Sequence, residues 1–170
     1  MNFEHIYSDY TGLSHLIFSL LAAATGTIVL INPKGTRLHM LVGRVYGISM
    51  IGLLVTAFMI YNLYGKFAIF HWMAVVSTIT LLGGMVPMYL KKPASYISLH
   101  YNFMYWSVMG LYGAFVAEMM VRIPRMVIEE GSPNAMFYNM VGIAIFFVMG
   151  FAYYGIKKKQ KQWASFDKSG

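Results

Sequence analysis

The chain of 170 residues contains no cysteine, and only 11% of its residues are charged. Without cysteine the protein cannot form a disulfide bond, a thiolate-held iron–sulfur cluster or a c-type haem attachment. A soluble domain usually has about 25% charged residues, so the low charge content excludes an ordinary cytosolic enzyme. It also excludes a disordered chain and a coiled coil, because both depend on many charged side chains.

Motifs typical of soluble enzymes are also missing. The chain has no Gly-x-Ser-x-Gly nucleophile motif, no phosphate-binding loop, no dinucleotide fingerprint and no His-Glu-x-x-His zinc motif. Its composition is instead strongly apolar, with 58% hydrophobic and 16% aromatic residues. These proportions are typical of a membrane protein.

Five stretches of the chain are long and apolar enough to be membrane spans, which need about 20 residues each. They cover about residues 11–31, 38–63, 67–90, 98–121 and 135–156. We therefore predict a single all-α membrane domain over residues 1–170, with five transmembrane helices and a basic cytoplasmic tail at 157–170. We expect the first four helices to form an up-down core and the fifth to lie at its periphery.

The first apolar segment does not have the features of a cleaved signal peptide. It is preceded by Glu4 and Asp9 rather than by basic residues, and no clear cleavage site follows it. We expect this segment to remain in the mature protein as its first span.

The formal net charge of +7 has a simple interpretation in a membrane protein. If the N-terminus lies outside, the inner segments hold nine basic residues: Lys34, Arg37, Lys91, Lys92, Lys157, Lys158, Lys159, Lys161 and Lys168. The outer segments then hold only Lys66, Arg122 and Arg125. This bias predicts an outer N-terminus and an inner C-terminus, and makes nucleic-acid binding an unnecessary explanation of the charge.

Four of the five histidines each lie near the start of a different predicted helix. The predicted orientation places His15 and His71 near the outer face and His39 and His100 near the inner face. Each pair joins helices i and i+2, which are diagonal partners in an up-down four-helix bundle. Two diagonal imidazoles at one depth can ligate a flat haem from both sides, so the pattern predicts two b-type haems.

Small residues share the helix faces of two of these histidines. Gly26 follows His15 at +11, and Gly43 and Gly47 follow His39 at +4 and +8. A face with few side chains can receive a flat cofactor, although small residues at this spacing also allow two helices to pack closely. Both interpretations remain open from the sequence.

Arg44 lies within the second predicted span, five residues after His39. One interpretation is that its guanidinium group pairs with a haem propionate or a quinone. The alternative is that the side chain extends to the inner membrane surface and anchors the helix there.

The arrangement of residues 11–121 resembles that of the two-haem transmembrane cytochromes b, including the ascorbate-reducing and ferric-reducing type. The resemblance concerns architecture rather than a sequence motif. It implies bis-histidine haems, electron transfer across the membrane, and a quinone or another small molecule as donor or acceptor.

A second resemblance is closer in sequence. The segment Lys34-Gly35-Thr36-Arg37-Leu38-His39, followed by Gly43-Arg44, resembles the signature of a family of uncharacterised bacterial integral membrane proteins. It supports a membrane fold and the importance of His39 rather than any particular chemistry. From the compact form of the chain and the absence of a targeting sequence, we expect a bacterial inner (plasma) membrane as the location.

Two other functions fit the same sequence. The protein could be a non-redox scaffold or transport-accessory subunit whose histidines are structural or bind a metal ion, or it could conduct protons or metal ions through histidine relays. An intramembrane zinc hydrolase is less favoured, because such a site needs three or four ligands at one depth. The expected partners are the lipid bilayer and either a second membrane subunit or a second copy of the chain.

Overall fold

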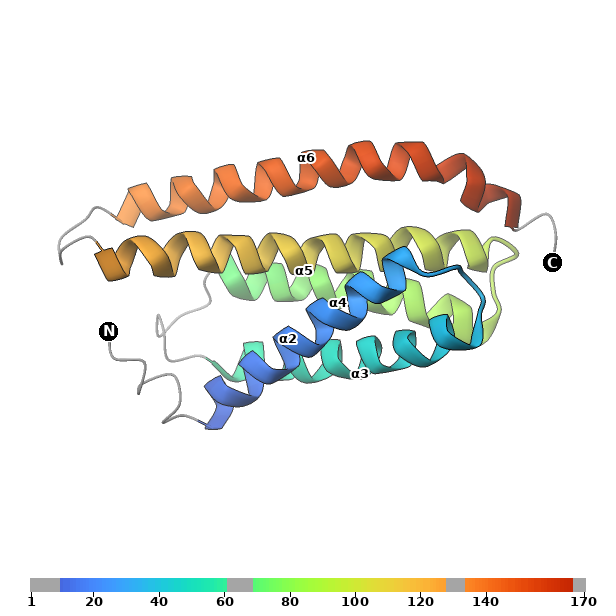
Figure 1. Cartoon of the computed structure of the whole chain (residues 1–170), viewed down its shortest axis with the longest axis horizontal. Coiled ribbons are helices and arrows are strands. Elements are labelled where there is room, and N and C mark those ends of the chain that lie inside the picture. Colours follow the sequence, from blue (N-terminus) through green and yellow to red (C-terminus); the bar gives the residue numbers. More distant parts are fainter. Residues whose placement is uncertain (1–9, 61–68, 128–133, 167–170) are drawn as a thin grey trace. The chain divides into compact units, whose positions relative to one another are not determined.

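The computed structural model describes residues 10–60, 69–127 and 134–166, and all the regular structure in these ranges is helical (Figure 1). The helices are α2 (Tyr10–Ile31), α3 (Arg37–Met59), α4 (Ile69–Leu90), α5 (Tyr96–Val127) and α6 (Asn134–Phe166). The predicted all-α class is confirmed for the described residues, with one helix for each predicted span.

Among the residues that the structure describes, four helical segments are long and apolar enough to cross a membrane. They are Tyr10–Ile31, Arg37–Met59, Phe70–Leu90 and Asn139–Lys159. This finding supports an integral membrane protein. The predicted span at 98–121 lies within α5, but no segment of α5 is among the four found in the described residues.

Two helices extend beyond the predicted spans. α5 passes residue 121 and ends at Val127, and α6 passes residue 156 and ends at Phe166. Charged residues set the limit of an apolar stretch but do not end a helix, because lysine, glutamine and arginine are good helix formers. Lys157, Lys158 and Lys159 are therefore helical residues, and helix also covers part of the predicted basic tail.

The chain divides into two compact units, Met1–Leu81 and Leu82–Gly170, and the division falls within α4. In the first unit α2 packs on α3, which it crosses obliquely in Figure 1. In the second unit α5 and α6 run alongside each other over most of their lengths. The predicted orientation in the membrane and the up-down core of four helices stay predictions.

The connection between α2 and α3 is built from side-chain and backbone caps. The ammonium group of Lys34 donates hydrogen bonds to two carbonyl groups in the last turn of α2, at 2.5 and 3.0 Å. Gly35 has a φ of 78°, which glycine adopts without steric cost. Thr36 caps α3, since its hydroxyl oxygen accepts a hydrogen bond from the backbone N–H of His39 at 3.1 Å. These contacts place His39 in the first turn of α3.

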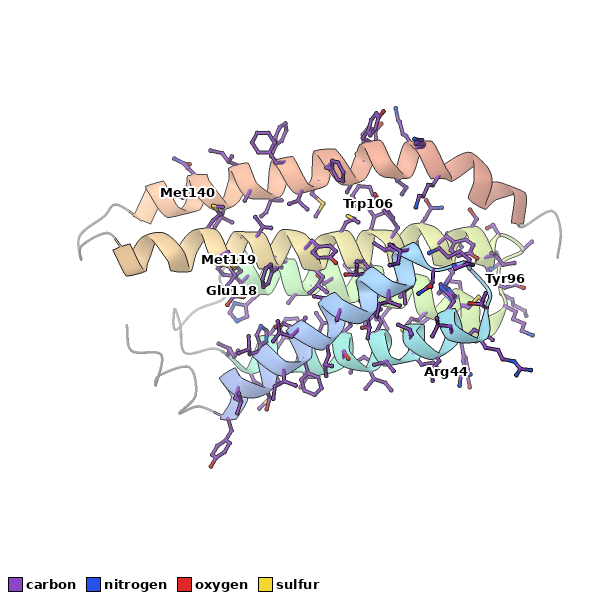
Figure 2. The ribbon with its side chains drawn as sticks, viewed as in Figure 1. Arg44, Tyr96, Trp106, Glu118, Met119 and Met140 are labelled. Atoms are coloured by element: carbon purple, nitrogen blue, oxygen red, sulfur yellow. The ribbon has the colours of Figure 1, made fainter. Side chains whose placement is uncertain are left out.

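A buried tyrosine joins α5 to α6. The hydroxyl group of Tyr105 donates a hydrogen bond to the carbonyl oxygen of Ala152 at 2.9 Å. A Cβ atom on Gly155 would lie only 2.5 Å from that hydroxyl oxygen, so glycine makes room for the tyrosine. Figure 2 shows Trp106 of α5 and Met140 of α6 between the same two helices. The predicted peripheral helix is thus packed directly on α5.

One side of α6 carries large apolar side chains that the chain itself does not cover. Phe146, Phe147, Phe151 and Tyr154 are all between 69% and 78% exposed. Such a continuous apolar surface would be unfavourable in water, whereas lipid acyl chains would cover it at no cost. The exposed aromatic face therefore fits a helix that contacts the bilayer.

Candidate functional site

Each of the four predicted ligand histidines lies within the first two turns of its helix. His15 lies in α2, His39 in α3, His71 in α4 and His100 in α5. The predicted distribution of one histidine near each helix start is therefore confirmed. His5, the remaining histidine, lies outside the described residues.

His15 is oriented by a hydrogen bond from α2 to α3. Its Nδ1 atom lies 3.1 Å from the hydroxyl oxygen of Thr56. That oxygen also lies 2.8 Å from the carbonyl oxygen of Gly52 and 2.9 Å from that of Leu53, and both carbonyls can only accept. The Thr56 hydroxyl group donates to these carbonyl groups of α3, and its oxygen can accept the proton of Nδ1 when His15 carries that proton. In that tautomer the ring lone pair that can ligate a metal is on Nε2.

His100 is oriented in the same way by α4. Its Nδ1 atom lies 2.9 Å from the carbonyl oxygen of Gly84, which can only accept a hydrogen bond. The proton of neutral His100 is therefore on Nδ1, and its lone pair is on Nε2. Histidines that ligate metals usually donate their other ring N–H to a carbonyl, a carboxylate or water, which fixes the orientation of the ring.

Two glycines bring α5 close enough to α4 for this contact. A Cβ atom on Gly83 would lie 2.7 Å from the ring of Phe103. A Cβ atom on Gly84 would lie 2.7 Å from the sulfur atom of Met104 and 3.2 Å from its backbone nitrogen. Pro87 lies one turn later in α4 and removes a backbone N–H donor from that region of the helix. Glycine at both positions thus allows the backbone of α5 to approach the carbonyl that His100 uses.

The contact of α2 with α3 repeats this design. Phe18 follows His15 by three residues, as Phe103 follows His100. A Cβ atom on Gly52 would lie 2.7 Å from the ring of Phe18, so this phenylalanine also lies over a glycine of the neighbouring helix. In both units a His-x-x-Phe segment therefore places its imidazole and its phenyl ring on one adjacent helix. The repeated segment is visible in the sequence, but its partners Thr56 and Gly84 were not predicted.

His71 and His39 have different surroundings. His71 is only 6% exposed and its Nε2 atom is buried. His39 is half-buried, and its Nδ1 atom is buried. His15 and His71 belong to the same unit, whereas His39 belongs to the first unit and His100 to the second. Both pairings stay predictions from the sequence.

The glycines of the predicted cofactor faces are of two kinds. Gly26 and Gly47 are buried, which fits close helix packing. Nothing lies within 4 Å of the position that a Cβ atom on Gly43 would occupy. The face of α3 one turn beyond His39 therefore has open space beside it, which a flat cofactor on this face would require.

Arg44 is exposed, and Figure 2 shows its side chain extending away from α3 into the surroundings. This position fits an arginine that anchors α3 at a membrane surface. Its predicted contact with a propionate or a quinone stays a prediction.

Among the side chains that the structure describes, no three histidine, aspartate or glutamate residues gather closely enough to hold a metal ion together. A haem needs only two protein ligands, one on each side of its plane, because the porphyrin supplies the other four. The absence of a three-residue cluster therefore does not bear on a site held by two histidines.

Comparison of the chain with known protein families, curated proteins and solved structures found no match. The resemblances to transmembrane cytochromes b and to a bacterial membrane protein family therefore stay predictions.

Replacing Thr56 with valine tests the orientation of His15. Valine has nearly the same shape but cannot accept the Nδ1 proton, so we expect the variant to lose about 1 kcal/mol of unfolding free energy in mixed micelles. The His15 tautomer should also shift toward Nε2–H in ¹⁵N NMR spectra. Thr56→Ser keeps the hydroxyl group and should retain the tautomer. An unchanged tautomer in Thr56→Val would contradict the assignment.

Proposed function

We propose that this protein transfers electrons across a membrane through two b-type haems. One haem would be held by His15 and His71, and the other by His39 and His100. The observation that carries the proposal is that the Nδ1 atoms of His15 and His100 both lie within hydrogen-bonding distance of oxygen atoms on neighbouring helices. With the proton on Nδ1, Nε2 would be the ligating nitrogen in both rings.

The residues present fit the requirements of haem. Neutral imidazole is a good iron ligand, and each proposed pair contains one histidine whose Nδ1 atom contacts an oxygen atom of a neighbouring helix. His71 supplies a buried ring in the same unit as His15. Gly43 leaves open space beside the turn that follows His39, where a flat group would need it.

Haem supplies an iron that changes reversibly between its ferric and ferrous forms when it is bound. The residues of this chain would control the surroundings in which the iron changes its oxidation state. Thr56 and the carbonyl group of Gly84 would hold the imidazoles of His15 and His100 in place, and the two histidines of each pair would hold the haem iron for electron transfer. The apolar helices would limit access of water, which lowers the polarity around each iron.

The proposal includes an outer N-terminus, an inner C-terminus and a bacterial inner membrane. The donor and acceptor would be small redox molecules such as a quinone, or a partner protein on either side. Arg44 would meet an anionic propionate or a quinone oxygen near the inner surface. The exposed aromatic face of α6 would contact lipid, a second subunit or a second copy of the chain.

The visible spectrum of the detergent-purified protein tests this function. We expect a Soret band and, after reduction, the narrow α-band of a low-spin b-type haem. A colourless protein from haem-replete cells would contradict the proposal.

The second candidate function is that of a non-redox membrane scaffold. It is favoured by the same two hydrogen bonds, because His15 and His100 each join neighbouring helices and could serve only to hold them together. This function predicts a stable protein without haem. Glutamine in place of either histidine would then preserve the contact between the helices, since its amide group can also donate to the neighbouring helix.

A further inference from the structure

The last part of α6 carries a dense group of lysines with no acidic residue in the same helix. Lys157, Lys158, Lys159 and Lys161 lie within five positions, and no aspartate or glutamate occurs between Asn134 and Phe166. The helix itself therefore provides no carboxylate to neutralise these four charges. Because the segment is helical, its charges also have a defined spatial arrangement.

The helix spreads these charges around its surface. Successive residues of an α-helix are rotated by about 100°, so three consecutive lysines cover more than half of the circumference. Lys157, Lys158 and Lys159 are all exposed. They can therefore meet negative groups on several sides of the helix at the same time.

The position of these lysines along α6 indicates what they meet. The candidate membrane span of this helix is Asn139–Lys159, and the lysines lie at its C-terminal end, where it would reach the membrane surface. The ammonium nitrogen of Lys157 lies 4.8 Å from the centre of the Tyr153 ring, one turn earlier. An aromatic ring with a cation above it is typical of the interface between acyl chains and headgroups.

We propose that this lysine segment of α6, residues 157–161, binds the phosphate groups of anionic phospholipids. The charge is complementary to such headgroups, and the apolar end of α6 positions it at their depth. A soluble acidic partner would have to displace the headgroups that already surround the segment. This proposal does not depend on the presence of haem.

The test uses the full-length chain reconstituted in phosphatidylcholine vesicles that contain brominated phosphatidylglycerol. Trp163 is kept as the only tryptophan by Trp72→Phe and Trp106→Phe, so quenching of its fluorescence reports anionic lipid near the lysine segment. We expect Lys158→Gln/Lys159→Gln to lower the preference for phosphatidylglycerol on the order of tenfold. High salt should weaken the preference of the unsubstituted segment.

A matched control removes the same charge elsewhere. Lys91→Gln/Lys92→Gln changes two exposed lysines after α4 and should leave the quenching nearly unchanged. Glutamine keeps helix propensity close to that of lysine, and circular dichroism would verify that both variants are folded. Equal quenching in Lys158→Gln/Lys159→Gln and the parent protein would overturn the proposal. An equal loss in both double variants would also overturn it, because the effect would then be one of net charge only.

Discussion

Replacing His71 with alanine should lower the haem content of the purified protein from about two to about one per chain, because this change removes one axial ligand of one proposed site. His71 is 6% exposed, and a buried site leaves little room for water or another side chain to take the place of the imidazole. The remaining haem should keep its low-spin spectrum and its reduction potential. Pyridine haemochrome assays and a redox titration would measure these quantities.

The reciprocal variant distinguishes the two proposed sites. His39→Ala should also leave about one haem per chain, but the surviving haem should be the one that His71→Ala removes. A redox titration of the parent protein should then show two reduction potentials, one for each haem. Each variant should retain a different one of the two. His5→Ala is the control, since this histidine precedes all the predicted spans in the sequence and should leave the haem content unchanged. Loss of both haems from either ligand variant would contradict two independent sites.

Replacing Gly84 with valine should separate α4 from α5. The first added carbon would lie 2.7 Å from the sulfur atom of Met104 and 3.2 Å from its backbone nitrogen. The sulfur atom can move with its flexible side chain, but the nitrogen belongs to α5 and moves only with the helix. Overpacking of this kind costs about 1–3 kcal/mol, so unfolding in mixed micelles should occur at lower denaturant concentration.

The same variant should affect one histidine selectively. Separation of the helices would lengthen the 2.9 Å contact between His100 and the Gly84 carbonyl, and would release the imidazole from its fixed orientation. We therefore expect the haem assigned to His100 to be lost or shifted in potential, whereas the haem assigned to His71 should remain. Gly150→Val is the matched control, because nothing lies within 4 Å of the position of a Cβ atom there. Equal stability of the two variants would contradict the role of Gly84.

The helical elements could be predicted because apolar length is a property of the local sequence. The predicted spans at 11–31 and 67–90 agree closely with α2 (Tyr10–Ile31) and α4 (Ile69–Leu90). The end of α6 could not be predicted in the same way, because the charge of Lys157 limits the apolar span without breaking the helix.

The candidate site could be predicted only in part. The sequence identifies the histidines and their places near the helix starts. It does not identify their hydrogen-bond partners, because Thr56 is 41 residues from His15 and Gly84 is 16 residues from His100. These contacts depend on the register between helices, which is set by close approaches at glycines such as Gly52. The sequence feature that accompanies both contacts is a histidine followed three residues later by phenylalanine, and it occurs once in each unit.

The number of haems that each chain binds is the most direct test of the proposed electron transfer. A pyridine haemochrome assay of the unmodified protein, purified from haem-replete cells and combined with quantitative amino-acid analysis, measures this ratio. The proposed pairs of His15 with His71 and of His39 with His100 predict a value of about two. A value near zero would contradict electron transfer through haem, and a value near one would contradict the second histidine pair.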